Sequence, residues 1–243
     1  MTFWNSDRDE RRHEAFRRLS EIGEPAVPAL VELFEENRRP VSGDAFNALT
    51  NLGPSAASAV PRMRHLLANE SEDLQRRAAW VLGAVGPDAE SAVPDLVRLM
   101  QLPDPRVREI GAEALGKIGG AGHIALERAL SASDPSLREA GMIGMAMRPL
   151  DLESRRVLIT RGLADQSPLV RRKTVDLLLP VKRKDVEAIA EYLLRALGDT
   201  DPQVMQAAHG VLTVYVQGQR ATPRFHARAA DPFPACSTAF KID

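Results

Sequence analysis

The sequence predicts an all-α protein in which pairs of helices repeat along the chain and stack into a solenoid. Two observations carry this prediction. The segments "LGPSAASAVPRMRHLL" (52–67) and "VGPDAESAVPDLVRLM" (85–100) are copies of one unit, displaced by 33 residues. A second mark, an Asp or Ser followed by proline, recurs at spacings of 30, 33 and 34 residues. Periods of this length are the signature of stacked helical repeats. These marks are Asp104-Pro105, Asp134-Pro135, Ser167-Pro168 and Asp201-Pro202.

Each repeat is expected to contain a first helix, a short turn and a second helix. Gly86 ends a first helix because glycine accepts the left-handed conformation beyond a helix end, and Pro87 prevents the helix from continuing. Ser91, like Ser58 one repeat earlier, is expected to cap the second helix. Pro94 then falls in the first turn, where backbone N–H groups lack an intrahelical partner. An Asp-Pro or Ser-Pro pair starts the first helix of the next repeat.

Three columns of residues are predicted to share the buried face of the first helices. Spacings of four and then three residues keep them on one side of a helix. Small residues let neighbouring helices approach, and larger ones fill the space between them. Arg148 interrupts the third column, so the first helix of the fifth repeat is expected to end irregularly. The columns are Ala15, Ala45, Ala78, Gly111, Gly141, Thr174 and Ala208; Leu19, Leu49, Leu82, Leu115, Met145, Leu178 and Leu212; and Ile22, Leu52, Val85, Ile118, Arg148, Val181 and Tyr215.

Composition is that of an ordinary globular protein. The chain has 243 residues, of which 44% are hydrophobic and 27% charged, with a formal net charge of −1. This balance gives no general attraction to nucleic acid or anionic membranes. The first residues are charged where a signal peptide would need an apolar core. No run approaches the ~18–20 apolar residues of a membrane helix. We therefore expect a cytoplasmic protein without a membrane partner.

Three motifs resemble those of the HEAT repeat family, in the form also grouped with the HEAT-like repeats of phycobilisome lyases. They are the "AVPxL" helix starts, the "LGxxG" helix ends and the Asp-Pro-x-(Val/Leu)-Arg junctions, as in "DPRVREIGAEALGKIG" (104–119). The resemblance covers about residues 8–216, six full repeats and a seventh first helix. It implies an armadillo-like, right-handed α-solenoid over residues 1–217. Residues 218–243 lack the period and are expected to form a capping or disordered tail.

No constellation of catalytic or metal-binding residues is visible in the sequence. A single cysteine, Cys236, cannot build a thiolate metal site within one chain. The five histidines form no His-x-x-x-His pair, and no phosphate-binding loop or nucleophile elbow is present. Deoxyhypusine hydroxylase has a similar fold and binds iron with repeated His-Glu pairs, but only His13-Glu14 matches here. We predict no catalytic residue, metal ligand or cofactor.

The fold resemblance implies a non-enzymatic scaffold or adaptor that binds a protein partner on its concave surface. In HEAT proteins the second helices line that surface, so one exposed position of each second helix is the expected contact set. Four successive arginines there form a basic stripe that would accept an acidic segment. Glu32, Glu35 and Glu36 form an acidic patch at the other end. The alternative is a solvated face in which each arginine pairs with a nearby carboxylate, such as Asp95, Glu127 or Glu191. The contact set is Glu32, His65, Arg98, Arg128, Arg161 and Arg195.

Other functions and residues stay open at this stage. A bilin-lyase-type accessory protein and a nucleic-acid-binding HEAT-like protein are the alternatives to a scaffold, although nucleic acid is not the expected partner. Arg108, Arg138 and Arg171 follow the Asp-Pro or Ser-Pro junctions, and by resemblance they bond between repeats. Trp80 points off the core face and is expected to pack over a neighbouring turn, with an exposed anchor on the convex side as the alternative. The sequence leaves the partner's identity and the oligomeric state undetermined.

Overall fold

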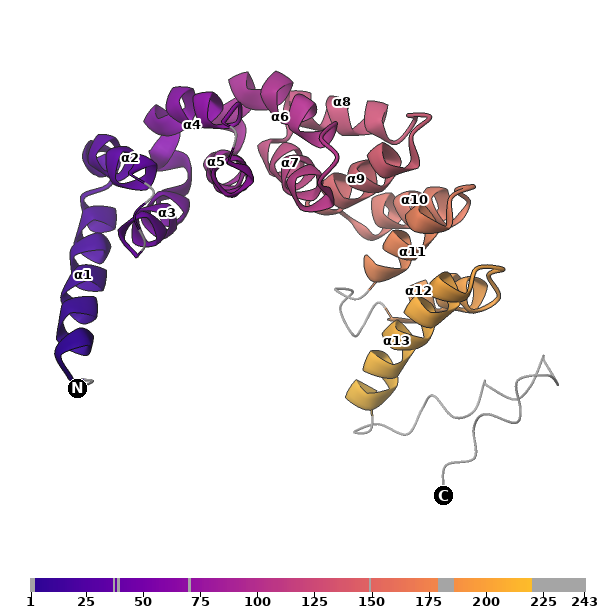
Figure 1. Cartoon of the computed structure of the whole chain (residues 1–243). Coiled ribbons are helices and arrows are strands. Elements are labelled where there is room, and N and C mark those ends of the chain that lie inside the picture. The colour runs from indigo at the N-terminus through magenta and orange to yellow at the C-terminus, as the bar shows by residue number, and fades with distance from the viewer. Residues whose placement is uncertain are drawn as a thin grey trace.

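A computed structural model describes residues 3–36, 38, 40–69, 71–148, 150–178 and 186–219. These residues form a curved row of helices without strands (Figure 1). The first helices of the repeats, called A helices below, are α1 (Phe3–Ile22), α3 (Val41–Leu52), α5 (Glu72–Val85), α7 (Pro105–Ile118), α9 (Pro135–Ala146), α11 (Pro168–Asp176) and α13 (Pro202–Gln219). The second helices, called B helices, are α2 (Val27–Glu35), α4 (Val60–Leu66), α6 (Val93–Met100), α8 (Gly120–Ala129), α10 (Leu152–Leu163) and α12 (Val186–Leu197). The predicted all-α solenoid is confirmed.

The boundaries between A and B helices follow the predicted glycines and prolines. Gly86, with a φ of 74°, lies directly after α5, and Pro94 is the second residue of α6. The serines differ from prediction. Ser58 and Ser91 lie inside short 3-10 helices, η2 (Gly53–Ala59) and η3 (Gly86–Ala92), that run directly into the B helices. No side chain caps α4 or α6, because the 3-10 turn before each helix takes the place of a capping residue.

The Asp-Pro junctions begin A helices as predicted. Asp104 accepts hydrogen bonds from the backbone N–H groups of Arg106 (2.7 Å) and Val107 (3.3 Å). The bond from Arg106 lowers the pKa of the Asp104 carboxyl group. Asp134 caps α9 in the same way, whereas the side chain of Ser167 makes no capping bond to α11. The junction at Ser167 therefore depends on Pro168, whose fixed φ suits the first turn.

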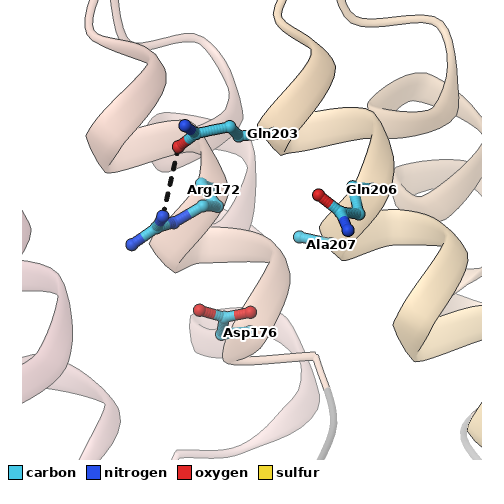
Figure 2. Close-up of a pocket in the computed structure, with 5 residues that line it drawn as sticks. All are labelled: Arg172, Asp176, Gln203, Gln206 and Ala207. Atoms are coloured by element: carbon cyan, nitrogen blue, oxygen red, sulfur yellow. Dashed lines mark hydrogen bonds between the residues drawn. The ribbon is translucent and has the colours of Figure 1, made fainter.

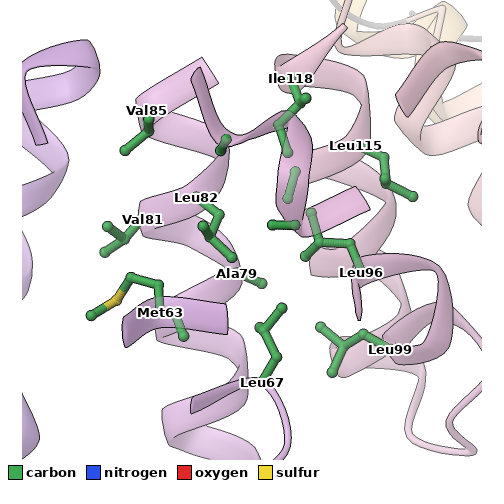
Figure 3. Packing of buried hydrophobic residues seen from close by; sticks show 14 of the residues in the cluster. Met63, Leu67, Ala79, Val81, Leu82, Val85, Leu96, Leu99, Leu115 and Ile118 are labelled. Atoms are coloured by element: carbon green, nitrogen blue, oxygen red, sulfur yellow. The ribbon is translucent and has the colours of Figure 1, made fainter. Parts of the chain in front are cut away.

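The predicted columns form the core from the second repeat onward (Figure 3). The first repeat is different. Ala15 is exposed while the adjacent Phe16 is buried, and Ile22 is 58% exposed. The reason is that α1 packs on α3 and η1 (Glu24–Ala26), so its buried face turns toward them. Val181 and the side chain of Tyr215 lie outside the described residues. The buried members are Ala45, Ala78, Gly111, Gly141, Thr174, Ala208, Leu49, Leu82, Leu115, Met145, Leu178, Val85 and Ile118.

The core divides into two clusters in the later repeats. One cluster runs from Phe16 to Val170 and the other from Ile159 to Val211. Helix α9 stops at Ala146, and the half-buried Arg148 lies in the turn that follows. The irregular end predicted for this helix is therefore confirmed, and it lies near the division of the core.

The A helices take the inner side of the curve. Figure 1 shows α5, α7 and α9 along the inside of the arc and α4, α6 and α8 along its outer rim. Successive A helices pack closely on one another, whereas successive B helices barely touch. More closely spaced helices must lie on the inside of a curved row. The expectation that the second helices line the concave side is wrong for this chain.

Small residues on the flanks of the A helices explain this curvature. A Cβ atom added to Gly83 of α5 would lie 3.1 Å from the Cα of Ala114 in α7. A Cβ atom on Gly116 of α7 would overlap the backbone carbonyl of Gly144 in α9. These backbones approach more closely than larger side chains would allow. The inner side of the arc is therefore shorter than the outer side.

Two arginines that follow the Asp-Pro and Ser-Pro junctions, Arg138 and Arg171, form ion pairs that link successive repeats. Arg138 donates two hydrogen bonds of 2.8 Å to the carboxylate of Asp165, and Arg171 donates bonds of 2.7 and 2.9 Å to Asp199. These bonds lower the pKa of both aspartates. Arg108 bonds only to backbone carbonyls of its own repeat. The position equivalent to Asp165 and Asp199 in the next repeat is Ala132, so no carboxylate meets Arg108.

Replacing Ala132 by aspartate should create the ion pair that Arg108 lacks. The new carboxylate would meet Arg108 as Asp165 meets Arg138. We expect the free energy of unfolding to rise by about 0.5–1 kcal/mol, the scale of a well-oriented, partly exposed ion pair. Denaturant unfolding would measure the change. The matched control is the same substitution in an Arg108→Gln background, where the gain should vanish. An equal gain in both backgrounds would show that no ion pair forms.

Candidate interaction surfaces

The six predicted contact residues lie on six successive B helices, and all six are exposed. Because the B helices form the outer rim, this column faces the convex side of the arc and not the concave side (Figure 1). The predicted column exists, but its location is corrected. Whether it binds a partner stays a prediction. The residues are Glu32 on α2, His65 on α4, Arg98 on α6, Arg128 on α8, Arg161 on α10 and Arg195 on α12.

The arginines of this column fall into two groups. Arg98 pairs with Asp95, and Arg161 donates hydrogen bonds to Glu127 (3.1 Å) and Ser131 (2.9 Å). The side chains of Arg128 and Arg195 form no ion pair or hydrogen bond with any residue that the structure describes. The alternative of a solvated face with paired arginines therefore fits Arg98 and Arg161 but does not fit Arg128 and Arg195.

Two neighbouring carboxylates of the predicted surface have other partners. Glu191, expected beside Arg195, instead pairs with Arg156 at 3.3 Å. In the acidic patch, Glu35 accepts two hydrogen bonds from Arg62 of the next repeat. Glu32 and Glu36 are exposed. These cross-repeat pairs could not be chosen from sequence, because they depend on the offset between adjacent B helices.

A shallow depression of about 480 Å³ lies between α10 and α12 on the side of the B helices. Arg161 lines it together with Val157, Thr160 and Tyr192. Val157 is 61% exposed. The Tyr192 hydroxyl accepts a hydrogen bond of 3.3 Å from Arg156, which fixes one wall.

The inner surface of the arc carries the partly exposed Trp80. Its indole ring, on α5, is 40% exposed, and the Nζ atom of Lys117 on α7 lies 4.3 Å from the ring centroid. Because α5 lies on the inside of the arc, the convex-side alternative for Trp80 is wrong, whereas its packing over a neighbouring turn stays a prediction. The cation–π contact holds the ring beside the next A helix and leaves part of it open to solvent.

Three carboxyl groups line the inner surface without an ion-pair partner among the described residues: Glu113 on α7, Glu139 on α9 and Asp176 on α11. Desolvation by the surrounding protein is the main cause that raises the pKa of each carboxyl group, although Asp176 is exposed and Glu113 and Glu139 are half-buried. Lys173 of α11 is close by, but its Nζ atom bonds to Glu109 of α7 at 2.9 Å. That ion pair passes over α9 and joins two repeats that are not neighbours.

Sequence reasoning missed this inner set because it followed the second helices. A signal was present, since Glu113 and Asp176, like Trp80, stand two residues after the small-residue column of their helix. That spacing places them on the side of the helix opposite the core. The correct choice of helix would have identified them.

Replacing Glu139 by glutamine should stabilise the fold slightly at neutral pH. Burial raises the pKa of Glu139 in the folded state above its value of 4.5 in the unfolded chain. Protonated Glu139 therefore contributes fully to the free energy of unfolding below pH 4.5. This contribution is lost as the pH rises through the raised pKa of the folded state. We expect a gain of up to about 0.5 kcal/mol at pH 7, the scale of a surface substitution. Denaturant unfolding at pH 7 and pH 4 would test this, since the gain should disappear at the lower pH. Glu36→Gln, at an exposed site, is the control and should change nothing.

A second depression of about 480 Å³ lies on the inner side between α11 and α13 (Figure 2). Arg172, Asp176, Gln203, Gln206 and Ala207 line it. The Nη1 atom of Arg172 donates a hydrogen bond of 3.2 Å to Oε1 of Gln203, and Asp176 lies one turn further along α11. The inner surface therefore continues from Trp80 to the last described A helix.

The described residues contain no group of three or more His, Cys, Asp or Glu side chains placed to hold a metal ion. None of their helices combines the length and the apolar character required to cross a bilayer.

Residues 60–146, from α4 through α9, match the family model of HEAT repeats. This segment contains HEAT repeats. Helix pairs continue on both sides of the matched segment. Among solved structures, an archaeal HEAT-like repeats protein from Thermococcus onnurineus NA1 is 16% identical with a TM-score of 0.45, covering 86% of this chain and 97% of its own. An engineered protein is 20% identical with a TM-score of 0.40, covering 79% and 97%. No curated protein matches the chain.

Proposed function

We propose that this HEAT-repeat chain is a non-catalytic scaffold that binds a protein partner along the inner surface of its arc. The observation that supports the proposal is a partly exposed tryptophan beside three unpaired carboxyl groups on successive A helices. Trp80, Glu113, Glu139 and Asp176 belong to α5, α7, α9 and α11. Tryptophan is enriched among residues that contribute most to protein interfaces. A row of repeats presents such residues to one extended ligand.

The expected partner segment carries basic side chains. Burial raises the pKa of the Glu113, Glu139 and Asp176 carboxyl groups, so ionisation there costs free energy in the free protein. A bound lysine or arginine would favour the ionised forms. The face of Trp80 would attract the same cations. Binding should therefore weaken as the pH falls and the three groups become protonated.

The experiment is affinity capture from the native organism with two matched variants, followed by mass spectrometry. Trp80→Ala combined with Glu113→Gln and Glu139→Gln removes the inner features, and all three sites are partly exposed. The control is Arg98→Ala on the outer rim. We expect a partner that the wild type and the control retain and that the inner variant loses, although the inner variant remains folded in thermal unfolding. An identical set of proteins on all three baits would contradict the proposal.

Nothing in the described part of the chain favours the bilin-lyase-type or nucleic-acid-binding alternatives over this scaffold. Its expected place of action is the cytoplasm, which remains a prediction from sequence.

A further inference from the structure

We infer that the outer faces of α8, α10 and α12 form a second docking surface, separate from the inner one, for an amphipathic helix with acidic flanks. This outer surface comprises Ile124, Val157 and Leu194 with Arg128, Arg161 and Arg195. A scaffold with two such surfaces could hold two partners at once, one inside the arc and one on its rim.

The apolar part of the outer surface consists of three well-exposed aliphatic side chains. Ile124 on α8 is 58% exposed, Val157 on α10 is 61% exposed and Leu194 on α12 is 70% exposed. Single exposed aliphatic residues are common, so only their grouping is informative. Ion pairs and hydrogen bonds show that the three helices are adjacent. Arg161 joins α10 to Glu127 of α8, and Arg156 joins α10 to α12.

The early repeats do not share this character. One turn before the column of exposed charges, α2, α4 and α6 carry proline, where α8 and α10 carry Ile124 and Val157 and α12 carries Glu191, with Leu194 three residues further along. Three early arginines also have ion-pair partners, although two of them share one carboxylate. Arg62 pairs with Glu35, and both Arg64 and Arg98 pair with Asp95. The outer rim thus changes from paired and polar to aliphatic with excess basic charge at the fourth repeat.

Free basic charge lies on both sides of the aliphatic residues. Arg128 on α8 and Arg195 on α12 have no ion-pair partner among the described residues, whereas Arg161 between them is paired with Glu127. The depression of about 480 Å³ between α10 and α12 is lined by Val157 and Arg161, so it joins the two kinds of side chain. Exposed aliphatic side chains on adjacent helices, with unpaired arginines on the first and last of these helices, can complement a short amphipathic helix.

The occupant is a helix with apolar residues on one face and Asp or Glu at its edges. Aliphatic contacts in a groove and carboxylate pairs with arginine are the usual means of holding such a helix. Nucleic acid fits less well. Its phosphates would leave the three exposed aliphatic side chains in contact with water.

The test uses a fluorescent peptide and the full chain. The peptide is a sixteen-residue helix with leucine at helical spacing and glutamate beside it, and the comparison peptides are its lysine counterpart and a scrambled sequence. We expect fluorescence anisotropy to show binding of the acidic peptide that weakens at high ionic strength. The lysine and scrambled peptides should bind at least about tenfold more weakly.

Variants of the protein locate the binding. Arg128→Glu with Arg195→Glu, and separately Val157→Asp, should each weaken the acidic peptide by about tenfold or more. Trp80→Ala on the inner surface is the matched control and should bind like the wild type. All of these sites are exposed, so thermal unfolding should be unchanged, and a variant that has lost stability would be replaced by Arg195→Gln and Val157→Ser.

Three results would overturn the inference. They are absence of binding by the acidic peptide, equal binding by the scrambled peptide, and full displacement of the peptide by duplex DNA. Loss of binding in the Trp80 variant would instead assign the peptide to the inner surface. That result would refute the outer docking surface and leave the proposed function of the inner surface unaffected.

Discussion

Replacing Gly116 by alanine should destabilise the protein by about 1–3 kcal/mol or more, although alanine is the better helix former. In an exposed helix the change would stabilise by about 1 kcal/mol. At this position the added Cβ atom would overlap the backbone carbonyl of Gly144 on the next A helix, and a backbone cannot move as a flexible side chain can. The helices α7 and α9 would have to separate, with a cost of about 1–3 kcal/mol or more. Chemical denaturation of the purified variant would measure this cost.

The control for Gly116 is a glycine in an equally helical but open site. Cβ atoms added to Gly43 in α3 or Gly210 in α13 would meet nothing within 4 Å. Gly43→Ala and Gly210→Ala should therefore stabilise by about 0.5–1 kcal/mol. If all three substitutions stabilised the protein, the close approach of α7 and α9 would be refuted, and with it the explanation of the curvature.

Replacing Leu82 by alanine should cost about 2–5 kcal/mol, the second large effect. The Leu82 side chain is fully buried, and Figure 3 shows it between the side chains of α4, α6 and α7. Removing three carbon atoms would leave a cavity that helices already in contact with one another cannot close. Equilibrium unfolding in urea gives the free-energy change.

Leu194 provides the comparison for Leu82, since it is the same residue type with a side chain that is 70% exposed. Leu194→Ala should change the free energy of unfolding by no more than about 0.5 kcal/mol. Similar losses at Leu82 and Leu194 would mean that the assigned core face is wrong. A small effect at both would mean that the repeat tolerates a cavity at its centre.

Much of the fold was predictable because each structural position recurs in several repeats, so its residue type can be compared between copies. The small and leucine columns agree in copy after copy, so the buried face of the A helices follows from spacing alone. The side of the arc that each helix occupies did not follow from that spacing. It depends on Gly83, Gly116 and Gly144, which lie within helices and allow the backbones to meet. In the "LGxxG" motif the second glycine ends the helix, as Gly86 does, whereas the first, as at Gly83 and Gly116, lies within the helix.

The candidate surfaces were predictable only in part, because pairing between repeats depends on distances that a single repeat does not contain. The exposed column from Glu32 to Arg195 was identified correctly on the B helices and placed on the wrong side of the arc. Which of its arginines are neutralised depends on the offset of adjacent helices, as the bond from Arg161 to Glu127 shows. Arg108 lacks the ion pair that Arg138 and Arg171 form, because Ala132 stands where they have an aspartate. This could be recognised in the sequence only once the bonds of Arg138 and Arg171 were known.

The ion pair between Lys173 and Glu109 has a mechanical consequence. In an ordinary solenoid each repeat contacts only its neighbours, so the whole array can flex like a spring by small changes at every joint. Here a bond of 2.9 Å spans two joints on the shorter side of the curve. Flattening the arc between α7 and α11 would stretch that bond. The bond is a partly exposed ion pair, so it adds a resistance of only about 0–1 kcal/mol, and bending should be slightly easier in the repeats outside the pair than between α7 and α11.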